Sequence, residues 1–272
     1  MMRALYTAAT GMIAEQTNVD TISNNLANVN TNGYKAERTE FKSLLYQTLQ
    51  TRTTTANGEN KPVGAQVGLG TRVAATTSMY TQGAMLDSES ATDFALEGDG
   101  FFAVRDVDGQ TYYTRNGNFT WSMDGLGGTM LTTVDGNPVL DQEGQEIRVP
   151  DGVSAENMYF TQTGDIGYLD ENRNEVPLDQ AFAVYQFNNP AGLEKLADSK
   201  LRATEASGDP MLESENAGLV QSKLCQYFLE GSNVQVADEM VNLIVAQRAY
   251  ELNSKAITTA DSMLDTANNL KR

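Results

Sequence analysis

The chain has 272 residues, of which 40% are hydrophobic and 20% are charged, ordinary values for a soluble globular protein with one large domain or two smaller ones. Because residues 1–45 carry no net charge and residues 232–272 carry −1, the net charge of −17 lies almost wholly on residues 46–231, which carry −16. An acidic centre argues against nucleic acid as a partner, because phosphates need basic patches. The sequence contains no histidine, the usual general base of hydrolases and the commonest transition-metal ligand, so we predict neither an enzyme nor a cofactor.

The sequence contains no stretch of 18 apolar residues, and Glu15 interrupts the region where a secretory signal would have its apolar core. We therefore predict no membrane span, and we expect any export to use a route other than a Sec signal. The single cysteine, Cys225, has aliphatic and aromatic neighbours and is predicted to be a small buried hydrophobe.

The first predicted element is a helix from about Leu5 to Asn28, which ends in a run of asparagine, threonine and glycine. Alternating steps of three and four residues from Leu5 trace a narrow stripe that is apolar at every position except Glu15. Such a stripe is stable only when another helix covers it. The predicted interface positions of this helix are Leu5, Met12, Val19, Ile22, Leu26 and Val29.

The segment after this helix changes character twice. Residues 34–50 have apolar side chains at helical spacing interrupted by charges, so they predict a short helix or an extended connector. Residues 51–62 are polar and poor in large apolar groups, and we expect a loop.

From Val67 to about Phe228 the hydrophobic period is two, with β-branched and aromatic residues between frequent turn signals. A glycine after an acidic residue or asparagine supplies the positive φ that tight hairpins need, so the pattern predicts consecutive antiparallel strands. Residues 190–197 are expected to form a short helix, and residues 219–229 the last strand. The turn signals are Asp99-Gly100, Asp108-Gly109, Asn116-Gly117, Asp124-Gly125, Asp135-Gly136, Glu143-Gly144 and Asp151-Gly152.

The last predicted element is a long helix that starts at residues 231–233 and runs to the end of the chain. Ser232 and Gln235 match the spacing of a capping box, and Lys271 and Arg272 suit the negative end of a helix dipole. The same stepping pattern gives a second stripe, which the polar residues Gln247, Ser254 and Asp261 interrupt. Its apolar interface positions are Val236, Met240, Leu243, Tyr250, Ile257 and Leu264.

These elements predict an α+β fold: a discontinuous helical stem of paired N- and C-terminal coiled-coil helices with an inserted antiparallel all-β domain, either a sandwich or an irregular barrel. The predicted parts are residues 1–33 with 232–272 as the stem, 34–70 as a connector and 71–231 as the β-rich outer domain. Amphipathic helices usually cover their own core, and that alternative applies to each helix taken singly. The presence of a stripe at both termini favours a stem that is completed by further copies.

The sequence contains only weak matches to catalytic and metal-binding motifs. Asp106 and Asp108 resemble the start of a calcium loop, but the later oxygen ligands are missing, so a hairpin turn is favoured. Paired carboxylates could serve a cell-wall glycosidase, and a monomeric adhesin-like β protein is another alternative. Most acidic residues of any protein are simply exposed, and we predict no metal site.

Two terminal segments carry a specific resemblance. Residues 23–35 resemble the N-terminal signature of the bacterial flagellar rod and hook family, and residues 236–244 with 247–256 resemble its C-terminal signature. Residues 98–102 and 113–119 resemble central motifs of the family. The N-terminal motif residues are Asn24, Asn25, Leu26, Ala27, Asn28, Thr31, Gly33, Tyr34 and Lys35.

The resemblance implies a structural subunit of the basal body, exported through the flagellar type III apparatus, that assembles with copies of itself into a helical tube. Other rod subunits, the hook protein and surrounding ring proteins are the implied partners, and torque transmission is the implied role. Residues 44–71 resemble a connector typical of distal rod members and absent from hook proteins. A proximal rod subunit or a hook-type axial protein of the same family is the alternative.

This connector is predicted to stiffen the tube by wedging between neighbouring copies, and a fragment of residues 67–228 is predicted to be a folded monomer. The positions expected to matter in the connector are Tyr46, Gln47, Pro62, Gly68 and Gly70.

Overall fold

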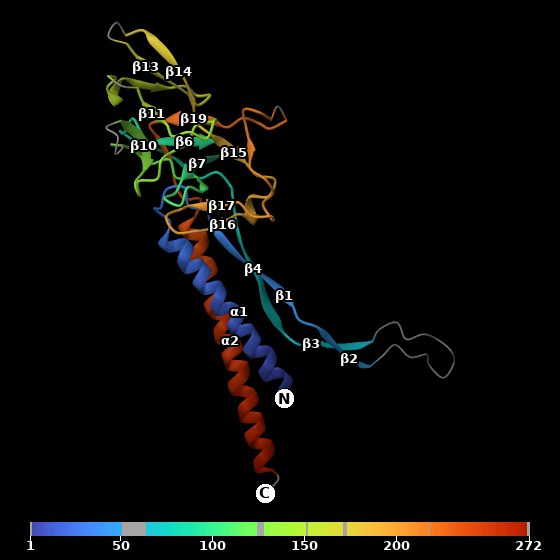
Figure 1. Ribbon diagram of the computed structural model, residues 1–272. Helices are drawn as coiled ribbons and strands as arrows, with labels where there is room; N and C mark the ends of the chain where they lie inside the picture. The colour runs from blue at the N-terminus through green and yellow to red at the C-terminus, as the bar shows by residue number, and fades with distance from the viewer. Residues whose placement is uncertain are drawn as a thin grey trace. The chain divides into compact units, whose positions relative to one another are not determined.

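The computed structural model describes residues 2–50, 64–123, 128–150, 152–170, 173–216 and 218–270 of the chain (Figure 1). The protein divides into two compact units, each described by itself below. The helical unit comprises residues 1–27, 37–78 and 235–272, and the β unit comprises residues 28–36 and 79–234.

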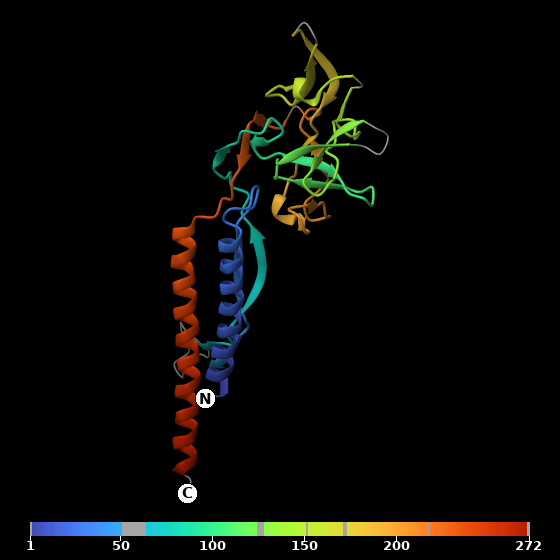
Figure 2. The ribbon, with the colours of Figure 1, turned by 90° about the vertical axis from the view of Figure 1, so that its left-hand side faces the viewer.

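The helical unit contains two long antiparallel helices that lie side by side, α1 (Met2–Ala27) and α2 (Val236–Asn269) (Figure 1 and Figure 2). Gly11 faces Asn253 so closely that a Cβ on Gly11 would lie 2.8 Å from the Asn253 Nδ2 atom. The side chains buried at this contact include Ala14 and Ala246, and small side chains let two helix backbones approach closely. The predicted pairing of the terminal helices within one chain is therefore present.

A long two-stranded ribbon completes the helical unit. Strand β1 (Glu37–Ser43) pairs with β4 (Thr71–Ser78), and β2 (Tyr46–Gln50) pairs with β3 (Ala65–Gly68), both antiparallel. The helical alternative for residues 34–50 is thus wrong and the extended one is correct, because cross-strand pairing satisfies backbone groups that a short helix would leave open. The loop prediction for residues 51–62 lies outside the described residues.

The β1–β4 part of the ribbon lies along α1 and is attached to it at both of its ends. The Thr39 hydroxyl donates to the Thr21 hydroxyl at 2.9 Å, and both residues are buried. At the other end, Gly70 has φ +115, and a Cβ there would lie 2.1 Å from the Thr10 Oγ1 atom. Only glycine has both the backbone freedom and the lack of side chain that this contact requires.

The predicted helix ends need two corrections. Helix α1 begins at Met2 instead of Leu5 and ends at Ala27. The capping box at the start of α2 is wrong: Gln235 is the N-cap residue and its side chain makes no cap hydrogen bond, while the Ser232 Oγ accepts from the Val234 amide at 3.3 Å. The predicted cationic end of α2, residues 271–272, lies outside the described residues.

The β unit is built from short antiparallel strands (Figure 1). They form a six-stranded sheet in the order β16-β17-β8-β7-β15-β18, two three-stranded sheets in the orders β11-β10-β9 and β12-β13-β14, and the pairs β19-β6 and β20-β5. The strands are β5 (Met85–Asp87), β6 (Phe94–Glu97), β7 (Phe101–Arg105), β8 (Thr111–Thr114), β9 (Phe119–Met123), β10 (Thr129–Thr133), β11 (Arg148–Val149), β12 (Met158–Phe160), β13 (Asp165–Leu169), β14 (Glu175–Ala181), β15 (Val184–Gln186), β16 (Glu194–Lys195), β17 (Leu201–Arg202), β18 (Met211–Leu212), β19 (Lys223–Gln226) and β20 (Phe228–Glu230).

Two local predictions in the β unit are corrected. The helix expected at residues 190–197 is a single 3-10 turn, η2 (Pro190–Gly192), followed by β16, and a second such turn is η1 (Ala155–Asn157). The single strand expected at residues 219–229 is two strands, β19 and β20, with Tyr227 between them.

The glycine turn signals divide into two kinds. Gly109, Gly136 and Gly144 have φ of 74, 85 and 76, as the hairpin prediction requires. Gly117 instead serves a close approach, because a Cβ there would lie 1.7 Å from the Phe94 carbonyl oxygen. Asp124, Gly125 and Asp151 lie outside the described residues.

The core of the β unit consists of two clusters of buried side chains. The larger cluster holds Phe94, Phe102, Phe119 and Phe182, with Phe160 at its margin; the ring centroids lie 4.7–6.4 Å apart, and the rings meet edge-on or tilted except for the stacked pair Phe119 and Phe182. Such contacts contribute beyond the area that they bury. The second cluster is centred on Phe101, Tyr113, Leu140, Ala183 and Phe187. Cys225, predicted buried, is half-buried.

Candidate assembly interface

The interface positions predicted on the N-terminal helix all face partly or wholly inward. Ile22 is buried, and the others are half-buried: Leu5, Met12, Val19, Leu26 and Val29, the last of these in the β unit. The half-buried state of Leu5, Met12, Val19 and Leu26 means that the rest of the helical unit covers only part of each side chain.

The positions predicted on the C-terminal helix divide into two groups. Leu243, Ile257 and Leu264 are half-buried, whereas Val236, Met240 and Tyr250 are 41%, 53% and 43% exposed. The stripe that faces α1 contains Ala246 and Ala260, both buried, instead of the predicted Gln247 and Asp261. A seven-residue sequence repeat has more than one possible phase, and close packing through small side chains selects this one.

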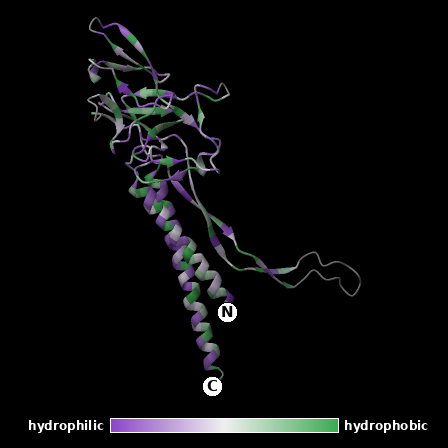
Figure 3. Ribbon diagram, in the orientation of Figure 1, coloured by the Kyte–Doolittle hydropathy of each residue, from purple (hydrophilic) through white to green (hydrophobic). Residues whose placement is uncertain are grey.

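Helix α2 also has a second apolar stripe. Val241, Ile244, Val245 and Leu252 are 56–69% exposed. At 100° per residue these positions lie roughly 130° around the helix from the stripe that holds Ala246 and Ala260. Apolar residues therefore alternate with polar ones around much of the helix, which Figure 3 shows as mixed green and purple along its length. Pairing with α1 covers one apolar stripe of α2 and leaves the second stripe exposed.

The tip of the ribbon exposes a further apolar group. Leu45, Tyr46 and Leu49 are 81%, 61% and 55% exposed. The Tyr46 ring covers the glycine opposite, since a Cβ on Gly68 would lie 3.3 Å from a Tyr46 ring carbon. Of the other predicted connector positions, Gln47 lies in β2, Gly70 follows β3, and Pro62 lies outside the described residues.

The first part of the N-terminal motif organises the helical unit through Asn25, which is 1% exposed. Its Nδ2 donates to the Glu37 carbonyl at 2.8 Å, and its Oδ1 accepts from the Glu37 amide at 2.8 Å, as a neighbouring strand would. The same Nδ2 lies 3.3 Å from Glu239 Oε1 on α2. Burial raises the pKa of the Glu239 carboxyl, and the Asn25 hydrogen bond opposes this. Asn25 thus joins α1, α2 and the ribbon. The other residues of this part of the motif, Asn24, Leu26 and Ala27, are its neighbours in sequence on α1.

The second part of the motif lies in the β unit. Thr31 Oγ1 donates to Asn28 Oδ1 at 3.1 Å, and the Tyr34 ring centroid lies 5.3 Å from the Lys195 ammonium. Gly33 has φ +69, its amide donates to the Glu230 carbonyl at 2.7 Å, and a Cβ would lie 2.7 Å from the Arg115 backbone. A glycine is therefore required at this position.

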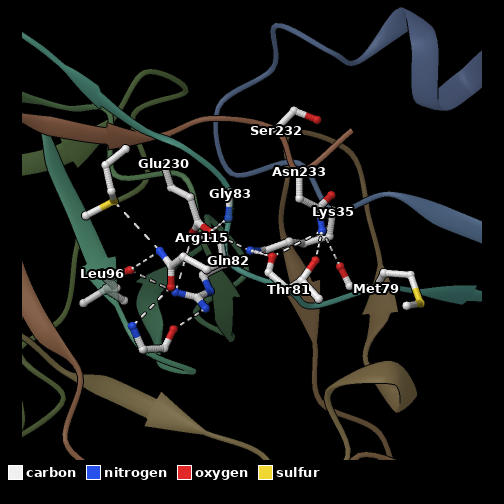
Figure 4. Close-up of polar contacts among 12 residues, drawn as sticks. Lys35, Met79, Thr81, Gln82, Gly83, Leu96, Arg115, Glu230, Ser232 and Asn233 are labelled. Atoms are coloured by element: carbon white, nitrogen blue, oxygen red, sulfur yellow. Dashed lines mark hydrogen bonds and ion pairs between the residues drawn. The ribbon is translucent and has the colours of Figure 1, made fainter. Parts of the chain in front are cut away.

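The motif ends in a buried ion pair between Lys35 and Glu230 (Figure 4). Their side chains are 3% and 0% exposed, and the Lys35 Nζ donates to Glu230 Oε1 at 2.6 Å and to the Thr81 carbonyl at 2.8 Å. Arg115 Nη1 lies 3.6 Å from the other carboxylate oxygen. Burial, reinforced by Arg115, lowers the pKa of Lys35 despite the attraction of Glu230. The sequence patterns included Lys35 and Arg115 as motif residues but gave no indication of Glu230.

The β unit also contains a polar cavity of about 290 Å³ that is lined by Asp165 and Glu213, among others. Glu213 braces the surrounding loops: its carboxylate accepts from the Ser222 amide and hydroxyl, both at 2.7 Å, and from Gln186 Nε2 at 2.8 Å. Among the described residues no three carboxylate, cysteine or histidine side chains cluster as a metal site would require. Neither described helix contains an apolar stretch long enough to cross a membrane.

Family comparisons cover both units. Residues 5–35 match the family described as flagella basal body rod protein, residues 95–168 match the flagellar hook protein FlgE/F/G D1 domain, and residues 226–270 match the flagellar basal body rod FlgEFG protein C-terminal family.

Whole-chain relatives have the same character. The flagellar basal-body rod protein FlgG of Borreliella burgdorferi is 44% identical, with 100% of both chains covered. The FlgG proteins of Agrobacterium fabrum and of Buchnera aphidicola from Acyrthosiphon pisum are 41% and 37% identical, each with 99% of this chain and 100% of the relative covered. The chain therefore belongs to the family of flagellar basal-body rod proteins that includes FlgG.

Proposed function

We propose that this protein is a structural subunit of the bacterial flagellar distal rod, which assembles with its own copies into a rigid helical tube and transmits torque from the motor to the hook. Relatives named as basal-body rod proteins span the whole chain and support this role. The structural observation that carries the proposal is the second apolar stripe of α2, which pairing within one chain leaves exposed.

The energetics of this stripe favour association with copies. Burial of one large aliphatic side chain contributes roughly 1.5–3 kcal/mol, so Val241, Ile244, Val245 and Leu252 together offer a substantial driving force. Monomeric soluble proteins rarely expose contiguous apolar patches of this kind. In the proposed tube, the α1–α2 pair of each copy acts as a coiled-coil stem, and the stripe of α2 packs against the stem of a neighbour.

The proposed division of labour has three parts. Residues 1–33 with 232–272 would form the stem, residues 34–70 the connector and residues 71–231 the outer domain. These functional bounds differ from those of the compact units, since residues 28–33 and 232–234 belong to the β unit and residues 71–78 to the helical unit. In the connector, the exposed Leu45, Tyr46 and Leu49 supply an apolar surface that a neighbouring copy would cover. A connector held between copies would stop them from sliding, which is the property that a stiff shaft requires.

The export route, location and neighbours of the protein follow from this role. The protein would be exported by the flagellar type III apparatus and would lie in the basal body outside the cytoplasm. Its neighbours would be other rod subunits, the hook protein and surrounding ring proteins.

The stripe can be tested with Ile244→Asp on the full chain. A charge in an apolar contact between copies is strongly unfavourable, so tube formation by the purified protein, followed by sedimentation and electron microscopy, should be lost. The monomer should retain its thermal unfolding temperature, because Ile244 is 56% exposed. Asn242→Asp, an exposed position on α2 that gains the same charge, is the matched control and should still assemble. Normal tubes from the Ile244 variant would overturn this interface.

The connector is tested by deletion of residues 51–66. Filaments of the deleted chain should bend more easily than those of the full chain, as measured from the persistence length in electron micrographs. If filaments of the deleted chain and of the full chain are equally stiff, the connector does not stiffen the tube, and the proposed tube-forming role is unaffected.

A further inference from the structure

The two ends of the β unit meet at one cluster of polar side chains. Residues 28–36 and 229–234 are separated by almost the whole unit in sequence, yet the Gly33 amide donates to the Glu230 carbonyl, and Lys35 binds the Glu230 carboxylate. The Glu230 Oε1 atom also accepts from the Gly83 amide at 2.9 Å. The Glu230 carboxylate, which also pairs with Arg115, therefore contacts three separate parts of the chain: residues 28–36, residues 79–83 and Arg115.

Asn233 ties the same segments a second time. Its Oδ1 accepts from the Ala36 amide at 2.7 Å, and its Nδ2 donates to the carbonyl of Met79 at 2.7 Å and to the hydroxyl of Thr81 at 2.9 Å. The Met79 amide in turn donates to the Ala36 carbonyl at 2.8 Å. We call Lys35, Arg115, Glu230 and Asn233 together the closure cluster, and Figure 4 shows them with their neighbours Met79, Thr81 and Gly83.

The charges of the closure cluster are unequal. Two buried cations, Lys35 and Arg115, share the buried carboxylate of Glu230, with Asp99 as a further acidic neighbour of both and Glu213 as one of Arg115. Arg115 has other partners, since its Nη2 donates to the Gly98 carbonyl and its guanidinium lies 5.3 Å from the Phe101 ring centroid. Removal of Glu230 would leave two like charges buried side by side, whereas removal of Lys35 would leave Glu230 and Arg115 paired.

The two segments that the cluster joins, 28–36 and 229–234, add no side chain to the hydrophobic core of the β unit. Arg115 is the member of the cluster that lies against a core residue, Phe101. The core could therefore stay folded while these segments detach, as in the local opening known for many proteins.

We propose that Glu230 is the closing residue of the β unit: it locks segments 28–36 and 229–234 to each other and to residues 79–83, independently of the hydrophobic core. The chain passes to the helical unit next to residues 28, 36, 79 and 234, and three of these positions adjoin the closure cluster, because Ala36 and Met79 bond to Asn233 and Val234 follows it. This last step rests on the proposed rod function: the cluster would carry load between these three positions through side-chain contacts, so that less of it falls on the sheets around the hydrophobic core.

The proposal is tested by hydrogen exchange on the full-length chain. In Glu230→Gln, the amides of Gly33, Gly83 and Ala36 should exchange at least about tenfold faster, while Ala103 in the core should change less than about twofold. Lys35→Met should accelerate the first three amides by a smaller factor, because Arg115 still neutralises Glu230. Glu175→Gln, at an exposed glutamate of β14, is the matched control and should change none of them.

The outcomes separate two questions. Equal acceleration at the closure amides and at Ala103, or no acceleration anywhere, would overturn Glu230 as an independent closing residue, whatever the rod does. If the exchange result holds while tubes of Glu230→Gln are as resistant to shear as the normal ones, the closing role stands and its load-bearing role fails. Failure of the normal chain to form tubes would count against the proposed function alone.

Discussion

The two units of this protein bury their apolar residues in opposite ways. In the β unit, Phe94, Phe102 and Phe119 are 0% exposed, inside clusters supplied by its own strands. In the helical unit, the side chains buried between α1 and α2 are mostly small, while large ones such as Ile244 and Leu252 remain exposed. The β unit is therefore complete within one chain, and the helical unit has the composition of a part that further copies must complete.

The largest expected effect tests whether the β unit is self-sufficient. Because the Met79 amide bonds to the Ala36 carbonyl, a short glycine-rich turn can replace residues 37–78. The resulting fragment, residues 28–36 joined to 79–234, should be monomeric and should unfold in one cooperative transition, as measured by calorimetry and sedimentation.

The matched fragment is residues 67–228, which the sequence predicted to fold alone. It lacks Lys35, Glu230 and Asn233, so it leaves Arg115 buried without its carboxylate and loses strand β20. We now expect this fragment to lose cooperative unfolding. If it melts as sharply as the joined fragment, residues 28–36 and 229–234 are dispensable for the fold of the β unit. The β unit would then not need the complete set of segments described above.

Sequence patterns located the elements of each unit but not the contacts that join them. The apolar repeat of 3.5 residues predicted both terminal helices, but it placed Gln247 and Asp261 on the stripe of α2 that faces α1. The buried residues are instead Ala246 and Ala260, because a hydrophobicity pattern gives little weight to the alanines that permit close approach. The period of two found the β unit, but not that Gly117 serves a close contact instead of a turn. Glu230 was invisible because its partners are up to 195 residues away in sequence.

A second, smaller effect concerns the inner stripe of α2. Ala246 is 1% exposed against α1, so Ala246→Leu should force the helices apart and destabilise their pairing by about 1–3 kcal/mol. The readout is faster hydrogen exchange of α1 amides in the monomer, with unchanged exchange in the β unit. Ala256→Leu, at an exposed position of the same helix, should leave α1 amides unaffected. Equal behaviour of the two variants would show that the α1–α2 contact is not tightly packed.

A third effect probes the β unit by pH. Burial raises the pKa of Tyr113 to about 12, with Tyr185 as a second cause. A tyrosine with a raised pKa in the folded state stabilises it fully below pH 10, and this contribution is lost as pH rises from about 10 to 12. Tyr113→Phe should flatten that part of the stability curve, measured by urea unfolding at successive pH values. A curve as steep as that of the normal chain would assign the alkaline loss to other groups.

The smallest effect concerns Tyr227, at the corner between β19 and β20. It has φ +66, a strained value for a residue with a bulky side chain, and its position is held because its amide donates to the Asp93 carbonyl and its carbonyl accepts from Ser88. The side chain is 47% exposed, so little packing is lost on its removal. Tyr227→Gly should therefore stabilise the β unit by about 0.5–1 kcal/mol in urea unfolding, because glycine adopts this backbone geometry without strain. Tyr227→Ala keeps the strain and loses the ring, so it should not stabilise. If both variants destabilise equally, the ring must contribute more than the backbone costs, and the corner would be a packing site of the β unit.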